Sequence, residues 1–119
     1  MDVNIIILPV KFVLRHYSSK VLNAYPDIEF IVEGHTGNVP IHTDCMDDNW
    51  DLSVKRATSV IRILQKEYKM NPSRMTASGH SEYLPIASNE TIDERALNRR
   101  TRIIILPQLD QFFKLLLKK

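Results

Sequence analysis

The fold of this chain is decided by residues 28 to 64, which read IEFIVEGHTGNVPIHTDCMDDNWDLSVKRATSVIRIL. The first six residues place apolar side chains at alternate positions, which predicts a strand over Ile28–Glu33. A long polar loop from Gly34 to Asn49 follows. A helix then begins between Asn49 and Ser53, because apolar residues recur at offsets of three and four and form one stripe. The members of that stripe are Val54, Ala57, Val60, Ile61 and Leu64.

The alternation of strands and helices continues on both sides of this stretch. Before it, we expect a strand over Val3–Leu8 and a helix over Val10–Ala24. After it, a turn at residues 71–73 precedes a strand over Arg74–Ser78, a helix over Asp93–Arg99 and a strand over Thr101–Leu106. An amphipathic helix over residues 107–119 closes the chain. This order predicts an α+β fold in which the helices pack on one mixed sheet, with an extra C-terminal helix.

Composition and charge are those of an ordinary globular protein, and we expect a single domain over residues 1–119. The chain is 44% hydrophobic and 25% charged, close to the usual values. Its formal net charge of +2 is too balanced for a nucleic-acid-binding domain, which is normally clearly basic. The only cysteine, Cys45, cannot form an intramolecular disulfide.

The first residues indicate a strand, without an export signal. A secretory signal needs a positively charged start and a small-residue cleavage site, whereas this chain has an acid at Asp2 and then a short apolar run. Lys11 and Arg15 interrupt the run long before the roughly 20 apolar residues of a spanning helix. We therefore expect no direct membrane insertion.

Four short motifs occur in a fixed order along the chain. They are VEGHT at residues 32–36, NWDLSVKRA at 49–57, RMTASGHSEYLP at 74–85 and NRRTRI at 98–103. Together they resemble the OmpA/MotB C-terminal domain family over about residues 25–105, and most closely its MotB-like branch. His80 and Ser81 depart from the family pattern, which usually has an aromatic residue and a glycine there.

The resemblance implies a βαβαβ-type αβ sandwich that is a binding module and not an enzyme. Such domains hold the diaminopimelate residue of the peptidoglycan stem peptide. They anchor an envelope protein to the cell wall, in the periplasm or at the outer membrane of a Gram-negative bacterium, and need no cofactor. Such domains are normally attached to an N-terminal anchor domain or to a partner envelope protein, and we expect that anchor or partner to be missing from this chain.

The resemblance also assigns site residues. Arg56 matches the family arginine that grips the ligand carboxylate, a task for which a planar guanidinium is well suited. Asn49 matches a family asparagine and is also a candidate helix N-cap. Thr36 lines the pocket or simply closes its strand. Arg99 and Arg100 match the family arginine pair, and we expect one of them, Arg100 in preference, to face the ligand.

Gly37 is the most informative departure from the family pattern, which has at this position the aspartate that pairs with the ligand ammonium. Removing one partner of a desolvated charge pair typically costs about 2–5 kcal/mol, so wall binding would be weakened. The loop acids Asp44, Asp47 and Asp48 could replace the carboxylate, although acidic loops are usually only solvated. The alternative is a degenerate structural or protein-interaction module that has lost wall binding.

Other catalytic or metal chemistry has little support in the sequence. We treat the histidines His35, His42 and His80 as scattered loop residues, because their spacing matches no compact zinc motif. Neither a nucleophile elbow nor a phosphate-binding glycine loop occurs. No metal site is therefore expected.

Overall fold

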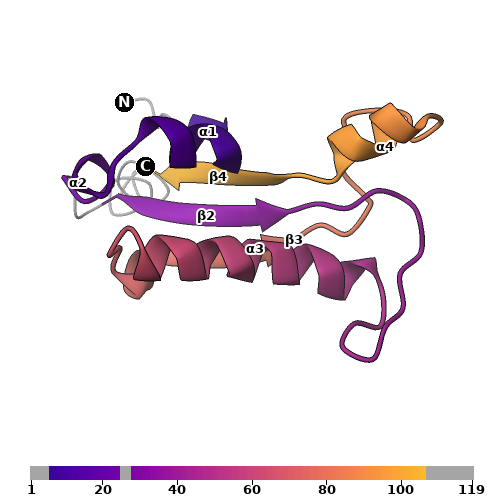
Figure 1. The fold of residues 1–119 in the computed structure, drawn as a ribbon, viewed down its shortest axis with the longest axis horizontal. Helices are drawn as coiled ribbons and strands as arrows, with labels where there is room; N and C mark the ends of the chain where they lie inside the picture. The colour runs from indigo at the N-terminus through magenta and orange to yellow at the C-terminus, as the bar shows by residue number, and fades with distance from the viewer. Residues whose placement is uncertain (1–5, 25–27, 107–119) are drawn as a thin grey trace, which may run out of the picture.

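The computed structural model describes residues 6–24 and 28–106 and shows helices and strands in alternation (Figure 1). The strands are β1 (Ile6–Pro9), β2 (Glu29–Gly34), β3 (Met75–Gly79) and β4 (Thr101–Leu106). The helices are α1 (Val10–His16), α2 (Ser19–Leu22), α3 (Asn49–Lys66) and α4 (Ile92–Asn98), with a short 3₁₀ turn, η1 (Pro72–Arg74), before β3.

The four strands form one mixed sheet in the order β1-β4-β2-β3. Strand β2 runs parallel to β3 and antiparallel to β4, and β4 runs antiparallel to β1. Parallel neighbours need a long crossover connection, and α3 supplies it between β2 and β3. The predicted α+β fold with a mixed sheet is confirmed.

Helix α3 lies very close to the sheet because glycines face it. Gly34 of β2 and Gly79 of β3 are register partners. A Cβ atom on Gly34 would lie 1.8 Å from the backbone oxygen of Ser53, and one on Gly79 would lie 2.5 Å from its Oγ. Only a residue without a Cβ allows this approach. The two glycines thereby fix the first turns of α3 above the strand ends.

One apolar core fills the space between the helices and one face of the sheet. Its buried members are Val10, Val13, Leu22, Phe30, Val32, Ala57, Leu64, Met70 and Ile103. Helices α1 and α3 contribute to the same cluster, and the hydroxyl of Tyr68, just after α3, donates to the carbonyl of Leu14 in α1 at 2.9 Å. Helices α1 and α3 therefore lie in one layer over the sheet, whereas α4 lies beyond the sheet, at the end where β4 begins (Figure 1).

Some predicted elements differ from the observed ones. The helix expected over Val10–Ala24 is two helices, because Tyr17 is extended (φ −120°, ψ 128°) and the side chain of Ser18 caps α2. Strands β2 and β3 each lie one residue later than predicted, and α4 one residue earlier. The predicted helix over residues 107–119 and the first residues of the predicted opening strand lie outside the described residues.

Two expectations for α3 need correction. Val54, predicted to be in the apolar stripe, is 42% exposed, whereas the neighbouring Ser53 is fully buried against the sheet. Asn49 is not the N-cap: the side chain of Asp48 accepts a hydrogen bond from the amide of Asp51, and Asn49 is the first helical residue. The cap leaves the Asn49 side chain available for other contacts.

Candidate functional site

A cleft of about 640 Å³ lies between α3 and the junction of α4 with β4. We call it the arginine cleft. Its lining residues are Met46, Leu52, Lys55, Arg56, Ser59, Val60, Arg99, Arg100 and Thr101. Four of these side chains are cationic and none is acidic, so the cleft is arranged to receive an anionic group. The structure thus brings together the three arginines that the sequence singled out.

Arg56 is half-buried in the wall of this cleft. Its Nη1 donates to the carbonyl of His35 at 2.7 Å, which fixes the guanidinium against the end of β2. Burial, together with the positive charge of Arg99, lowers the pKa of Arg56. A guanidinium has five N–H donors, so the single contact to His35 leaves donors for a ligand. An anion between Arg56 and Arg99 would relieve their repulsion.

Arg99 and Arg100 differ in how they are held. The Nη1 and Nη2 groups of Arg100 donate to the carbonyls of Asn98 and Leu84, at 3.3 and 2.9 Å. Burial and the charge of Arg102 lower the pKa of Arg100, against the opposite effect of Glu33. The side chain of Arg99 is exposed and forms no hydrogen bond or ion pair within residues 6–24 and 28–106. The preference for Arg100 as the ligand contact stays a prediction.

The loop beside the cleft is held in place by hydrogen bonds of Thr36, Gly37 and Asn49. Thr36 is buried, its Oγ1 donates to the carbonyl of Gly37 at 2.8 Å, and its amide donates to the carbonyl of Ser81. The Nδ2 of Asn49 donates to the carbonyls of Gly37 and Val39, at 3.4 and 3.2 Å. These bonds tie the loop after β2 to the start of α3, through Asn49, and to the loop after β3, through Thr36. Thr36 and Asn49 do not line the arginine cleft.

Gly37 does not line the arginine cleft, but it has room for a side chain that would lie beside Arg99. A Cβ atom at this position would lie 3.6 Å from the carbonyl oxygen of Arg95 and 3.8 Å from Cγ of Arg99, which are ordinary contacts. Its φ is not in the left-handed region. Glycine is therefore not required by the backbone at residue 37, and its consequence is chemical: no carboxylate stands at this position beside Arg99.

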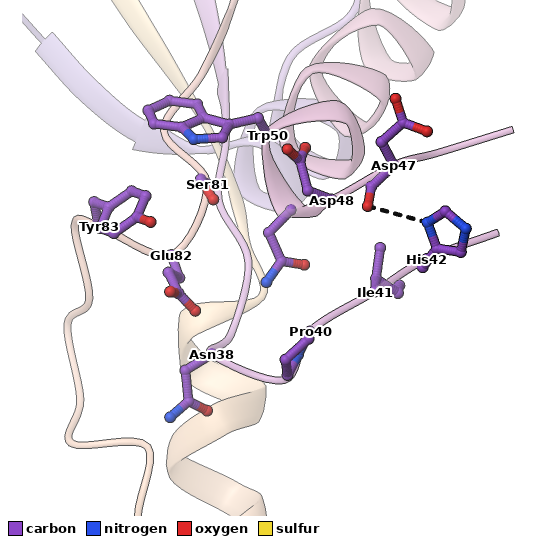
Figure 2. Close-up of a pocket in the computed structure, with 11 residues that line it drawn as sticks. Asn38, Pro40, Ile41, His42, Asp47, Asp48, Trp50, Ser81, Glu82 and Tyr83 are labelled. Atoms are coloured by element: carbon purple, nitrogen blue, oxygen red, sulfur yellow. Dashed lines mark hydrogen bonds between the residues drawn. The ribbon is translucent and has the colours of Figure 1, made fainter.

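The loop acids do not replace this carboxylate in the arginine cleft. None of Asp44, Asp47 and Asp48 lines it. Asp47 and Asp48 instead line a second hollow of about 510 Å³, which we call the acidic pocket (Figure 2). Its lining residues are Asn38, Pro40, Ile41, His42, Asp47, Asp48, Asn49, Trp50, Ser81, Glu82 and Tyr83.

A buried polar cluster that the sequence did not predict lies where β2 and β3 end. The Glu33 carboxylate accepts hydrogen bonds from His35 and His80 at 3.2 Å each and from Arg102 at 2.9 Å. The rings of His35 and His80 lie 4.9 Å apart and nearly parallel. The treatment of these histidines as scattered loop residues was therefore wrong. Part of the signal was available, because Glu33 and His35 are two residues apart at a strand end and such residues share a face. His80 could not be placed beside them, because that depends on the pairing of β2 with β3, in which Glu33 and Ser78 are register partners.

The charges of this cluster are balanced within the protein. Burial raises the pKa of Glu33, but hydrogen bonds from His35 and Arg102 and nearby positive charge outweigh it, so the pKa is lowered. Burial lowers the pKa of His35 to about 4. Glu33, His35 and His80 have donor atoms within 4.8 Å of one another, as a metal site requires. Arg102, however, already supplies the positive charge that a metal ion would bring to Glu33.

The fold and the arginine cleft define a small α+β module with a cationic cleft between one helix and the adjacent loops. The chain belongs to the OmpA family, whose model matches residues 14–99. This confirms the resemblance drawn from the four motifs. Within the described residues, none of the helices has the length and apolar character needed to cross a membrane.

Relatives support the MotB-like character of the chain. Motility protein B of Bacillus subtilis (strain 168) is 39% identical over 90 residues, which are 76% of this chain and 34% of that protein. Outer membrane porin F of Pseudomonas aeruginosa is 40% identical over 79 residues, 66% of this chain and 21% of that protein. The chain thus spans about a third or less of the length of these two relatives.

Solved structures agree with the fold. The cell wall anchor of the T6SS from Pseudomonas aeruginosa matches with a TM-score of 0.67 and 33% identity, over 81% of this chain and 64% of that chain. The periplasmic domain of Helicobacter pylori MotB matches with a TM-score of 0.71 over 98% of this chain and 86% of that chain. At 22% identity, the second likeness concerns the fold alone.

Proposed function

We propose that this chain binds peptidoglycan non-covalently, through the diaminopimelate of a stem peptide, and thereby anchors an envelope protein to the cell wall. The observation that carries the proposal is the arginine cleft, which is lined by four cationic side chains and no acid. Diaminopimelate presents carboxylates, and arginine binds carboxylates with two parallel hydrogen bonds. The named cell wall anchor and the motility relatives support the same role.

The hydrogen bonds and charges support a separate part for Arg56 and Arg99 and for the loop residues Asn49 and Thr36. Arg56 grips the carboxylate, since its guanidinium is already fixed by His35 and loses little freedom on binding. Arg99 adds a second positive charge from the opposite wall. Asn49 and Thr36 act indirectly, by holding the loop at Gly37 in place. No step of this binding requires a cofactor or a chemical reaction.

A second candidate function is a structural or protein-interaction module that has lost wall binding. Gly37 favours it, because the ammonium next to the bound carboxylate has no carboxylate from the protein at this position. The two candidates make different predictions for isolated cell wall, which allows a direct test. In either case we propose a periplasmic or outer-membrane-associated location, in which further parts of an envelope protein carry the membrane anchor.

Retention on purified peptidoglycan sacculi tests the proposal. The Arg56→Ala variant should be retained at least about tenfold less than the unmodified chain, which corresponds to ~1.4 kcal/mol. Arg62→Ala is the matched control, because Arg62 is an exposed arginine of the same helix that does not line the cleft. Equal retention of the Arg56 and Arg62 variants, or no retention of the unmodified chain, would favour the interaction module.

A further inference from the structure

The buried cluster at the ends of β2 and β3 carries an inference beyond the proposed function. We propose that Glu33, His35 and His80 form a binding site for a divalent transition-metal ion of the zinc class. The ligand atoms are Oε2 of Glu33 and the Nε2 atoms of the two histidines. The inference does not depend on wall binding, and it departs from the expectation, drawn from the spacing of the histidines in the sequence, that the chain has no metal site.

The distances between the donor atoms match those of a metal site. The Nε2 atoms of His35 and His80 each lie 3.2 Å from an oxygen of Glu33, and donor atoms of the three residues all lie within 4.8 Å of one another. Ligand atoms about 2.0–2.1 Å from a tetrahedral zinc ion lie roughly 3.3 Å apart. Imidazoles and carboxylates are also ligand types that zinc binds in proteins. An ion therefore fits the cluster after a small movement of side chains.

Two paired strands hold the backbone of the three residues in place. Gly34 of β2 and Gly79 of β3 are register partners, and the amide of His80 donates to the carbonyl of Gly34 at 3.1 Å. The amide of His35 donates to the carbonyl of Arg100 at 2.8 Å. Because the chain is already ordered around the ligand atoms, an ion would not have to order it on binding, and this favours affinity.

His80 gives the ion access to the cluster. Its side chain is 32% exposed, whereas that of Glu33 is 11% exposed and that of His35 is 1% exposed. The ring of His80 stacks nearly parallel on the ring of His35, with the centroids 4.9 Å apart. A rotation of the His80 side chain would turn the lone pairs of both Nε2 atoms towards one point. Water can take the fourth position on the exposed side, as it does at an open zinc site.

The protonation states of the buried ligands suit a metal ion, which needs an ionised carboxylate and neutral imidazoles. Burial raises the pKa of Glu33, but hydrogen bonds from His35 and Arg102 and nearby positive charge outweigh it, so the pKa is lowered. Burial lowers the pKa of His35 to about 4. At neutral pH the cluster therefore offers an ionised carboxylate and a neutral buried imidazole.

Arg102 weakens the site without blocking it. Its Nη2 donates to Oε1 of Glu33 at 2.9 Å, whereas Oε2 accepts only from His80 among the described residues. A carboxylate that binds a metal is commonly hydrogen-bonded as well, so Arg102 can stay on Oε1 while the ion binds Oε2. The positive charges of Arg102 and of Arg100, both of which act on His35, would repel the ion. We therefore expect tighter binding when the charge of Arg102 is removed.

Isothermal titration of the chelator-treated protein with Zn²⁺ tests the proposal. His80→Gln should weaken Zn²⁺ binding at least about tenfold, because glutamine can still donate a hydrogen bond to Glu33 but has no imidazole. Arg102→Gln should tighten binding at least about threefold, since it removes a neighbouring positive charge. His42→Ala is the matched control, because His42 is an exposed histidine outside the cluster, and it should bind Zn²⁺ as the unmodified chain does. Mg²⁺, which prefers oxygen ligands, should not bind.

Anomalous scattering from crystals soaked in Zn²⁺ locates the ion. We expect it about 2.0–2.2 Å from Oε2 of Glu33 and from the Nε2 atoms of His35 and His80. Circular dichroism checks that each variant keeps the fold. The metal site would be overturned if the unmodified chain did not bind Zn²⁺, if His80→Gln bound it equally well, or if His42→Ala abolished binding. These results are independent of the sacculi, so the metal site and the wall-binding proposal can fail separately.

Discussion

Replacing Gly37 with aspartate should tighten the binding of a diaminopimelate-containing peptide to the arginine cleft. The structure has room for the change, because a Cβ atom at residue 37 would make only ordinary contacts, the nearest at 3.6 Å. The new carboxylate would lie beside Arg99, at the edge of the cleft, where it can meet the ammonium of the bound amino acid. The backbone at residue 37 is not in the left-handed region, so we expect little effect on stability.

The size of the effect follows from the value of a partly desolvated charge pair. Removing one partner costs about 2–5 kcal/mol, and we take the lower end because the cleft is open and Arg99 would attract part of the new charge. About 2 kcal/mol corresponds to roughly thirtyfold in the dissociation constant. Gly37→Asn has nearly the same size without the charge and should give less than about threefold.

Isothermal titration of the soluble peptide into the three proteins measures this difference. The gain of Gly37→Asp over Gly37→Asn should shrink as salt is added, because screening weakens partly exposed pairs. Urea unfolding of each variant provides the control for stability. Equal affinities of the aspartate and asparagine variants would refute the reasoning, since the ligand ammonium would then not lie near residue 37.

Three further predictions concern the frame that holds the cleft. Gly34→Ala should lower the free energy of unfolding in urea by about 1–3 kcal/mol, because the added Cβ would meet the Ser53 backbone at 1.8 Å; a change within about 0.5 kcal/mol, the usual scatter of surface substitutions, would contradict this. Ser81→Gly should raise Tm slightly, since Ser81 has φ 53° and left-handed backbone costs an ordinary residue about 1–2 kcal/mol; a lower Tm would show that no strain is relieved. Lowering the pH should destabilise the fold where His35 titrates in the unfolded chain but not in the folded one, between its usual pKa of 6.5 and about 4. The unfolded state binds more protons in this window, so stability decreases as the pH is lowered, by up to about 1.4 kcal/mol per pH unit. His35→Gln should flatten that dependence down to about pH 4.5, below which the ionised Glu33, with its lowered pKa, begins to lose its own contribution; an unchanged slope in the variant would exclude His35 as its cause.

The elements of the fold could be predicted because they depend on local patterns. Strand β4 begins and ends where the sequence predicted, and α3 follows from its periodic apolar residues. The break at Tyr17 was missed because the apolar spacing continues across it, while the capping by Ser18 is a weak signal. The order of the strands depends on contacts between distant segments and cannot be read from one pattern.

Only those residues of the site that belong to the sequence motifs could be predicted. The three arginines were identified from the sequence, and they lie around one cleft. The hydrogen bonds of Arg100 to the carbonyls of Asn98 and Leu84 could not be predicted, because they depend on tertiary contacts. The acidic pocket could not be predicted, because it combines Trp50 and Asp48 with Glu82, which comes from the loop after β3. Spacing along the chain carries no information on such a meeting of distant loops.

The most direct test of the account is a crystal structure of the chain with a diaminopimelate-containing stem peptide. We predict that a carboxylate of the peptide lies in the arginine cleft, about 2.7–2.9 Å from a guanidinium nitrogen of Arg56, the usual length of a charge-assisted hydrogen bond. A peptide bound elsewhere, with Arg56 still hydrogen-bonded only to the carbonyl of His35, would contradict the claim that this cleft binds the peptidoglycan stem peptide.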